Sequence, residues 1–375
     1  MQTIQSLRKK LMLRIAHIES SVNLGGQELR ILDQIRWLRN HGHSAWLLAR
    51  EDSTVYREAV RRELPAYPIP FRGSANPRAI FRLIQFVQSK KIHLLDCHSA
   101  SAASTALSAR IFGTAIVQTL HYGFKTDLVH KYLLRYGSDH IITVSQRIAD
   151  KLTKLNFADR QMISIIPTGI DLSRFRPEID KHSIRNEFNI AENTAVISEI
   201  AMIRPDKGQK YLIRAVDRIA DVNNNIRFFI VGSATRTEYL DDIRKEIAAI
   251  RHRDKVILTG FRQDTEKFIA ASDVIVNSSI FEPRSQVIHQ AFAMKKIVIA
   301  SNAGGNKESI VHGETGFLFH PENIESLAKT VLAVLGNHTG QIRERAYLKA
   351  LSEFGIDTMM DRTLNIYHKV LTYNQ

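Results

Sequence analysis

The sequence predicts an α/β protein made of two successive domains, each with a parallel sheet between layers of helices. Three observations support this. Short apolar segments typical of buried strands alternate with longer segments of helical spacing. A segment with one glycine and two prolines, residues 165–177, interrupts the alternation and has the composition of a hinge. A new series of strands begins at residue 195, and 375 residues are enough for two domains.

The first domain is expected to begin with a strand over residues 13–18, a turn at Gly25 and Gly26, and a helix over residues 27–40. Glycine in such a turn lets a ligand approach the backbone closely, although a plain turn is an equal alternative. Further strands are expected at residues 45–49, 92–97, 115–120, 140–144 and 162–166. Two histidines, His98 and His121, directly follow strands. A neutral imidazole at the position of His121 could donate a hydrogen bond to a ligand, with a structural role as the alternative, and His98 is interpreted as structural.

The second domain places a lysine, Lys207, just before a helix, with Arg204 three residues earlier. Cations beside a helix N-terminus can neutralise a diphosphate leaving group. Arg204 as a plain surface residue is the alternative. The next strands, 227–231 and 256–258, end at Gly232 and before Arg262.

The segment from Phe281 to Gly316 is the most informative in the chain. Glu282 lies in a loop directly before a helical pattern, and Gln290 lies eight residues later, near the same face of that helix. A strand over residues 297–300 and a Gly304-Gly305 turn follow. Strand ends and helix N-termini around a polar pair predict a pocket for a phosphorylated ligand. Glu282 as a helix cap and Gln290 as a surface residue are the alternative.

Composition limits the remaining choices. The net charge is +14, with 24 Lys and Arg against 13 Asp and Glu up to residue 172, and 28 against 25 after it. The basic first half favours an anionic partner, and an acidic membrane surface or a lipid-linked acceptor is preferred to nucleic acid, because aromatic residues do not interleave with the basic ones. The sequence contains no apolar stretch long enough to span a membrane and no signal-peptide pattern, so a cytoplasmic protein is expected. Met12 could be the working start, and the single Cys97 is expected to be buried and inert.

Several catalytic motifs are missing from the sequence. It has no Asp-x-Asp triplet, no His/Cys/Asp cluster with metal-ligand spacing, no G-x-S-x-G and no Walker A string. We therefore expect no metal, and protein cations in the role that a metal would take.

Three stretches resemble the retaining glycosyltransferases of family 4, which have the GT-B fold. The family pattern of a glutamate, E-A-M-A, G-K-P-V-I and D-G-x-T-G-F-L reads here as Glu282, residues 290–294, residues 296–299 and residues 312–318. The linker N-G-V-D-x-x-x-F-x-P reads as residues 168–177, and G-G-A-E reads as residues 25–28. Departures are Thr168 for the asparagine of the linker, Gln290 for the second glutamate and Met202 for the arginine of G-R-L-x-x-x-K-G. The resemblance covers residues 13 to about 371.

The resemblance implies two Rossmann-like domains facing each other across a cleft: residues 13–172 after an extension of residues 1–12, residues 173–354, and a C-terminal helix, 355–375, that crosses back to the first domain. It implies a metal-independent, retaining hexosyl- or heptosyltransferase that uses a nucleotide-diphosphate sugar. Its acceptor would be a glycan or lipid-linked intermediate of bacterial lipopolysaccharide, capsule or exopolysaccharide. The implied catalytic residues are Glu282, His121 and Lys207. The implied donor-binding residues are Gly25, Gly26, Arg204, Lys207, Gly232, Arg262, Glu282, Ser285, Gln286, Val287 and Gln290.

Two other interpretations stay open. Met202 and Gln290 both fall in the implied donor site, which would suit a protein that binds a nucleotide sugar without transferring it, or an epimerase. A nucleic-acid-binding α/β protein would rest on charge alone.

Overall fold

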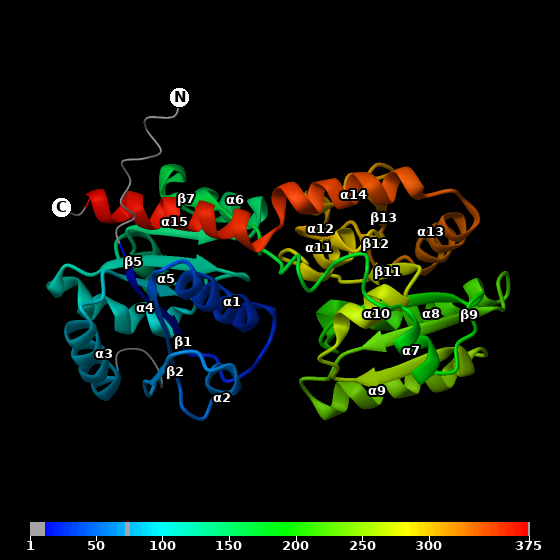
Figure 1. Ribbon diagram of the computed structural model, residues 1–375, viewed down its shortest axis with the longest axis horizontal. Coiled ribbons are helices and arrows are strands. Elements are labelled where there is room, and N and C mark those ends of the chain that lie inside the picture. The colour runs from blue at the N-terminus through cyan, green and yellow to red at the C-terminus, as the bar shows by residue number, and fades with distance from the viewer. Residues whose placement is uncertain (1–11, 72–75, 374–375) are drawn as a thin grey trace. The chain divides into compact units, whose positions relative to one another are not determined.

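The computed structural model describes residues 12–71 and 76–373, which form two compact units (Figure 1). Unit 1 holds the chain up to Pro167 and again from Met359, and unit 2 runs from Thr168 to Thr358. The divisions expected from the sequence fall slightly later, after residue 172, and slightly earlier, after residue 354. The expected extension, residues 1–12, lies outside the described residues except for Met12.

Unit 1 contains a seven-stranded parallel sheet in the order β3-β2-β1-β4-β5-β6-β7. Its strands are β1 (Arg14–Glu19), β2 (Ser44–Ala49), β3 (Ala66–Pro68), β4 (Leu94–Cys97), β5 (Ala115–Leu120), β6 (His140–Thr143) and β7 (Ile163–Ile165). Its helical segments are α1 (Gly26–Asn40), α2 (Thr54–Arg61), α3 (Pro77–Lys90), α4 (Ala100–Ala106), η1 (Leu107–Phe112), α5 (Leu128–Arg135), α6 (Gln146–Lys154) and η2 (Arg160–Met162).

The central strands of unit 1 are apolar and buried along nearly their full length. In β1, Ile15, Ala16 and Ile18 have no exposed surface, as expected for a parallel strand with helices on both faces of its sheet. The same strand also buries His17 and Glu19 completely. Buried polar groups need hydrogen-bond partners, so these two residues indicate a polar site at this end of the strand.

The C-terminal helix α15 (Ile356–Tyr373) joins unit 1 from Met359 onwards (Figure 1, red). Its Tyr367 has no exposed surface, and its hydroxyl donates to Asp96 Oδ2 at 2.5 Å. Asp96 belongs to the central strand β4. The last helix of the chain is therefore tied to the middle of the unit 1 sheet.

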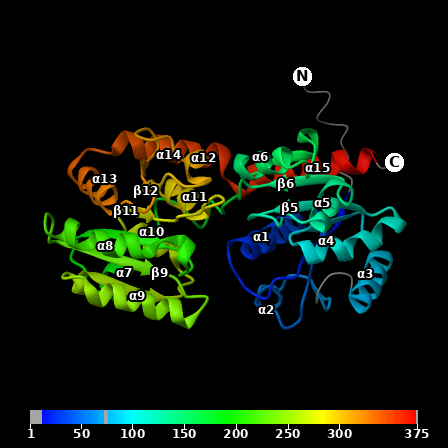
Figure 2. The same cartoon turned by 180° about the vertical axis from the view of Figure 1, so that it is seen from behind.

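Unit 2 contains a six-stranded parallel sheet in the order β10-β9-β8-β11-β12-β13 (Figure 2). Its strands are β8 (Ala195–Ile200), β9 (Ile226–Val231), β10 (Val256–Gly260), β11 (Val274–Asn277), β12 (Ile297–Ser301) and β13 (Phe317–Phe319). Its helical segments are α7 (His182–Glu187), η3 (Pro205–Lys207), α8 (Gln209–Ala220), α9 (Thr237–Ala249), η4 (Arg253–Lys255), α10 (Thr265–Ala271), α11 (Gln286–Ala293), α12 (Asn306–Ser309), α13 (Ile324–Gly336) and α14 (Gly340–Glu353).

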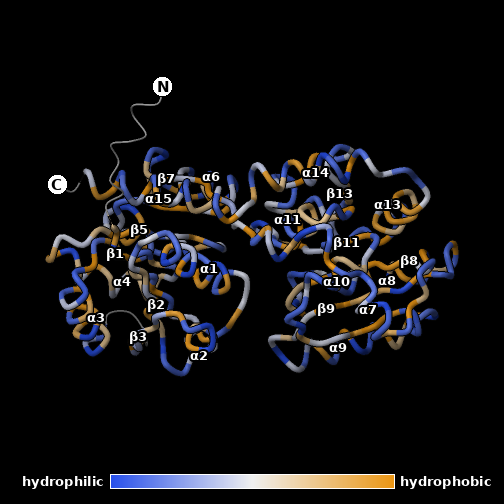
Figure 3. The backbone as a smooth tube through the Cα atoms, in the orientation of Figure 1, coloured by the Kyte–Doolittle hydropathy of each residue, from blue (hydrophilic) through white to orange (hydrophobic). Residues whose placement is uncertain are grey.

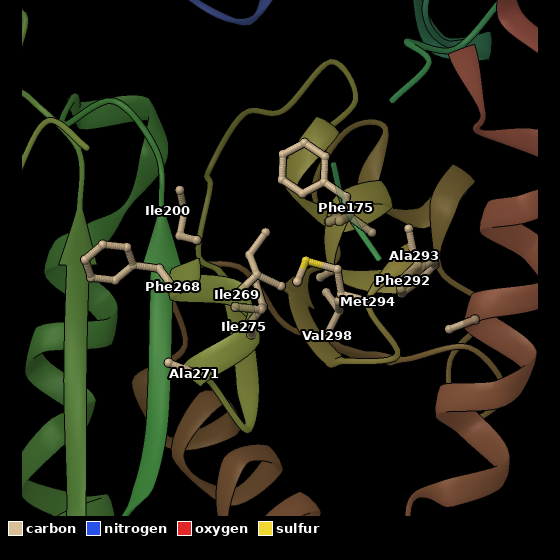
Figure 4. Packing of buried hydrophobic residues seen from close by; sticks show 14 of the residues in the cluster. Phe175, Ile200, Phe268, Ile269, Ala271, Ile275, Phe292, Ala293, Met294 and Val298 are labelled. Carbon is tan, nitrogen blue, oxygen red and sulfur yellow. The ribbon is translucent and has the colours of Figure 1, made fainter. Parts of the chain in front are cut away.

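Apolar side chains fill both faces of the unit 2 sheet. On one face, α10, α11 and α14 pack over the strands, and Figure 4 shows Phe268, Ile275 and Phe292 within this cluster. On the other face, α8 and α13 pack over a second cluster. Figure 3 shows that hydrophobic segments coincide with strands of both sheets. The apolar cores hold the sheets rigid, and the loops at the strand ends carry the residues that can bind ligands.

The predicted α/β class is confirmed, with two Rossmann-like units. Strands β3 and β13 were not predicted, because edge strands of three residues are too short to show a pattern. In the described part of the chain, no helix has both the length and the apolar character needed to cross a membrane.

Candidate active site

The unit 2 sheet has a switch point between β8 and β11, which are neighbours although three α-helices and two strands separate them in the chain. In open parallel sheets, ligands bind outside the carboxyl ends of the strands at such a point. The loop after β8 carries Lys207, and the loop after β11 carries Glu282. Topology therefore brings together two of the three predicted catalytic residues.

The Lys207 ammonium donates to Glu282 Oε2 at 2.7 Å, and the Ser279 hydroxyl donates to the same oxygen at 3.1 Å. The Lys207 side chain is 15% exposed and the Glu282 side chain 5%. An ion pair this sheltered from water is held more firmly than a surface pair. Ser279 was not predicted, because a serine in a loop gives no signal of its own.

Glycines allow the loops around this pair to pack backbone against backbone. Gly208 has φ +72°, and a Cβ there would lie 2.2 Å from the Ser278 carbonyl oxygen. A Cβ on Gly305 would lie 1.8 Å from the Pro283 carbonyl oxygen. The Gly305 amide also donates to the Glu282 carbonyl at 2.7 Å. Side chains larger than hydrogen would separate these loops, so glycine is required here.

A buried carboxylate, Glu199, lies beneath the same loops at the end of β8. Its Oε1 accepts from the Ser278 amide at 3.2 Å and from the Ser278 hydroxyl at 2.7 Å. Burial raises the pKa of Glu199 to about 7, while these hydrogen bonds and the Lys207 charge oppose the rise. Glu199 was not predicted as a site residue, because a single acid inside an apolar strand belongs to no motif.

The second predicted cation, Arg204, donates to Asp206 Oδ2 at 2.8 Å. The Asp206 carbonyl in turn accepts from the Ile280 amide at 2.8 Å, which joins the two loops. At the family arginine position, the Met202 carbonyl accepts from Gln209 Nε2 at 3.0 Å. The role of Arg204 as a phosphate cation stays a prediction, because its charge is shared with a carboxylate here.

The predicted residues of the following segment gather at the start of α11. Ser285 is the N-cap of this helix, and its hydroxyl accepts from Asn277 Nδ2 at 3.1 Å. Gln286, Val287 and Gln290 lie half-buried on the helix itself. Within residues 12–71 and 76–373, no hydrogen bond joins Gln290 to Glu282, so their common grip on a ligand stays a prediction.

The remaining predicted donor residues of unit 2 differ in their surroundings. Gly232 follows β9 with φ +149°, and a Cβ there would lie 1.9 Å from the Ala201 carbonyl oxygen. The Arg262 guanidinium instead donates to two carboxylates, Asp264 and Glu187, at 2.6 to 2.9 Å. These bonds raise the pKa of Arg262. A nucleobase contact by Arg262 would compete with them and stays a prediction.

One further buried histidine in unit 2 was not predicted. The His289 ring on α11 contacts the Thr168 carbonyl at 3.2 Å and the Ser309 hydroxyl at 3.1 Å, and it stacks on Phe354 at 3.7 Å. Burial lowers its pKa well below the ordinary value. This histidine anchors the linker to the helix that follows Glu282.

The unit 1 sheet has its own switch point, between β1 and β4. The turn after β1 holds Gly25 and Gly26, where α1 begins. The Gly25 amide donates to Glu28 Oε2 at 2.8 Å, so the acid of this glycine motif caps the helix. Glu19 accepts from the Ser21 amide at 2.7 Å and from Gln27 Nε2, and burial raises its pKa to about 7. Binding of phosphates by these glycines stays a prediction.

Three histidines join in a row at the same edge. His17 Nδ1 lies 3.0 Å from His98 Nε2, and His98 Nδ1 lies 2.9 Å from His121 Nε2. His98 and His121 line a cavity of about 200 Å³ within unit 1, together with Gln27 and Tyr122. The sequence pattern connects neither His17 nor His98 to His121, because the three residues belong to different strands or to the loops that follow them.

Asp96 lies beside this row, with Oδ2 at 3.7 Å from both His17 Nδ1 and His98 Nε2. One ligand atom each from His17, Asp96 and His98 lie within 4.8 Å of one another, which a metal ion could use. Two observations weigh against a fit. Asp96 Oδ2 already accepts from Tyr367, and the His17 and His98 nitrogens that face Asp96 are engaged with each other at 3.0 Å. The buried Arg30 guanidinium lies close enough that, after burial, its charge also contributes to the lowered pKa of both histidines. A divalent cation here would add positive charge beside a buried guanidinium.

Two doubly wound parallel sheets with charged loops at their switch points define a class, the α/β proteins that bind nucleotides. Residues 24–174 match the model of Glycosyltransferase Family 4, and residues 180–350 match that of Glycosyl transferases group 1. The chain belongs to the family 4 glycosyltransferases and has the GT-B fold.

Individual relatives agree with this. An uncharacterised glycosyltransferase of Methanocaldococcus jannaschii is 28% identical over 66% of this chain and 64% of its own length. The UDP-Gal:α-D-GlcNAc-diphosphoundecaprenol α-1,3-galactosyltransferase of Escherichia coli is 23% identical over 95% of this chain and 96% of its own. An Anabaena protein solved in complex with UDP has a TM-score of 0.84 and 21% identity, covering 95% of this chain and all of that one.

Proposed function

We propose that this glycosyltransferase is a retaining, metal-independent hexosyltransferase that takes its sugar from a UDP-sugar. The observation that carries the proposal is the sheltered Lys207–Glu282 pair at the unit 2 switch point. A lysine there can bind a departing diphosphate, while a carboxylate can hold the hydroxyls of the sugar. The UDP bound to the Anabaena neighbour and the UDP-galactose in the name of the Escherichia coli relative support uridine as the base.

In this proposal, the acceptor hydroxyl attacks the anomeric carbon from the face that the diphosphate leaves. The bond from that carbon to the phosphate oxygen breaks as the bond to the acceptor oxygen forms, and the acceptor proton passes to the phosphate oxygen. Lys207 stabilises the charge that develops on the diphosphate, with Arg204 as a second cation. Glu282 orients the sugar and Gln290 the ribose, and His121 is a candidate sugar ligand within unit 1. No metal is assigned to this step.

We propose a lipid-linked or membrane-bound glycan as the acceptor, at the inner face of a bacterial cytoplasmic membrane. Helix α5 exposes Leu128 by 83%, Val129 by 60% and Tyr132 by 59%. Lys125 precedes this helix in the chain, and Lys131 lies on it between Val129 and Tyr132. An exposed apolar face with neighbouring cations suits a bilayer that contains anionic lipids. The diphosphoundecaprenol acceptor in the name of the Escherichia coli relative is of this kind.

Thermal shift against UDP, GDP, ADP, CMP and their sugars tests the donor. UDP and one UDP-sugar should raise the melting temperature of the wild-type chain, and Glu282→Gln should remove the additional shift that the sugar gives. A response to GDP or ADP alone would reject the uridine assignment. Release of UDP that begins only on adding acceptor would distinguish a transferase from the alternative, a protein that binds the donor without transferring its sugar.

Vesicle co-sedimentation tests the membrane proposal. Leu128→Asp with Val129→Asp should abolish binding to vesicles of mixed neutral and anionic lipids. Val222→Asp serves as the matched control, because Val222 is 72% exposed in unit 2 and should not affect binding. Equal binding of both variants would reject α5 as the contact.

A further inference from the structure

We infer that the row of histidines in unit 1 is a directional hydrogen-bond relay, in which His17 and His98 hold the His121 ring in the tautomer protonated at Nδ1. His17 and His98 would then be positioning residues for His121. The relay follows from contacts within unit 1, and only its use in sugar binding rests on the proposed function.

The contacts allow two polarities. Each neutral imidazole carries one N–H, so each of the two short contacts, 3.0 Å and 2.9 Å, holds a single proton. In the outward polarity, His17 donates to His98, and His98 donates to His121. In the inward polarity, every donor is reversed. Mixed states would place two protons or two lone pairs against each other in a short contact.

The surroundings of His17 choose between the polarities. His17 has no exposed surface, and within the described ranges its Nε2 has no hydrogen-bond partner. In the inward polarity, this nitrogen would carry a buried N–H without an acceptor. In the outward polarity, it carries only an unused lone pair. A buried donor left without an acceptor is the rarer and costlier defect, so the outward polarity is favoured.

Burial, with a contribution from a neighbouring guanidinium, keeps all three histidine rings neutral. Burial lowers the pKa of His17 to about 3 and that of His98 and His121 well below the ordinary value, and the charge of Arg30 adds to each effect. Asp96 opposes this for His17, but its two oxygens accept from the Thr119 and Tyr367 hydroxyls at 2.7 and 2.5 Å. The relay therefore carries orientation and not charge.

The consequence lies at the cavity that His98 and His121 line. Since His121 Nε2 accepts from His98, its only N–H is at Nδ1, and His121 can act as a hydrogen-bond donor toward a ligand. The inward polarity would make the same nitrogen an acceptor. A hydrogen-bond donor suits the oxygen atoms of a sugar. This preference is set at His17, the ring at the other end of the row.

Histidine-labelled protein tests the relay without any substrate. Long-range ¹H–¹⁵N correlation spectra at neutral pH distinguish a protonated ring nitrogen from a bare one, and His121→Asn identifies the His121 signals. We expect Nδ1 of His121 to be protonated in the wild-type chain. Protonation at Nε2 of His121 would overturn the proposal.

Two substitutions at His17 sharpen the test. His17→Asn keeps an N–H where Nδ1 lies, so His121 should keep its Nδ1 proton. His17→Leu removes that donor, so His98 should protonate Nε2 toward Asp96 and His121 should move its proton to Nε2. His43→Leu is the matched control, a buried histidine of the same unit that accepts from the Leu13 amide, and it should leave His121 unchanged. The same His121 tautomer in both His17 variants would overturn the relay.

Two further readouts distinguish the relay from a metal site and test its use in sugar transfer. Added Zn²⁺ should leave the signals of His17 and His98 unchanged, and their stoichiometric displacement would overturn the relay in favour of a metal site. With a working donor, His17→Leu should lower kcat about tenfold with little change in KM, and His17→Asn should restore it. Failure of this kinetic result with the tautomers as expected would contradict the sugar-binding role of His121 and not the relay.

Discussion

Replacing Lys207 with methionine should separate the structural and catalytic effects of the pair with Glu282. The structure sets the stability effect. Breaking a fully buried ion pair costs about 3 to 5 kcal/mol, but Lys207 is 15% exposed and Ser279 still donates to the carboxylate, so we expect about 2 kcal/mol. Adding Glu282→Gln to the Lys207→Met variant should recover most of the lost free energy of unfolding, because the amide leaves no unpaired charge.

Turnover should fall much further than stability alone would explain. Removing one group that stabilises transition-state charge typically lowers kcat by about 100- to 1000-fold. The assay measures UDP release from a donor that thermal shift has identified. It is run at a temperature at which urea titration shows the variant to be folded. Lys210→Met is the matched control, since Lys210 lies just inside α8 and its ammonium contacts the Tyr211 ring at 5.0 Å. Turnover of Lys207→Met within threefold of the wild type would refute the assigned role.

Three further predictions concern stability. His17, His98 and His121 are neutral in the fold and protonate near their ordinary pKa once unfolded. Their contribution to the free energy of unfolding is therefore present above pH 6.5 and is lost as the pH falls, for His17 toward about pH 3. Urea unfolding between pH 7 and 5 should show that His17→Asn reduces the slope of this free energy against pH by about 1 kcal/mol per unit, and an unchanged slope would contradict the prediction. Burial raises the pKa of Glu199 to about 7, so its favourable contribution to the free energy of unfolding is present below pH 4.5 and is lost by about pH 7. Glu199→Gln should therefore stabilise the chain at pH 8 by about 3 kcal/mol. A urea midpoint lower than that of the wild type at pH 8 would count against this prediction. Gly305→Ala should destabilise unit 2 by more than about 3 kcal/mol because its Cβ would meet the Pro283 carbonyl at 1.8 Å, whereas Gly336→Ala, with no atom within 4 Å, should be neutral or stabilising in thermal melts.

Much of the fold could be predicted from the sequence, because its signals are local. Apolar strands such as Ala195–Ile200 stand out by composition, and the linker at residues 165–177 stands out by its glycine and prolines. Glu282 and Lys207 could be singled out because each lies in a motif beside a helix start. Short edge strands such as Ala66–Pro68 could not, since three residues show no periodicity.

The sequence by itself determined the α/β class, the two domains, the family, and Lys207 and Glu282 as separate candidate catalytic residues. Only the tertiary structure decided that their charged atoms meet at 2.7 Å, that Glu199 lies buried beneath them, and that His17, His98 and His121 form one row. The physical reason is that strand order, and not sequence distance, decides which loops share a sheet edge. Residues as far apart as Asp96 and Tyr367 therefore become partners through contacts that no local pattern records.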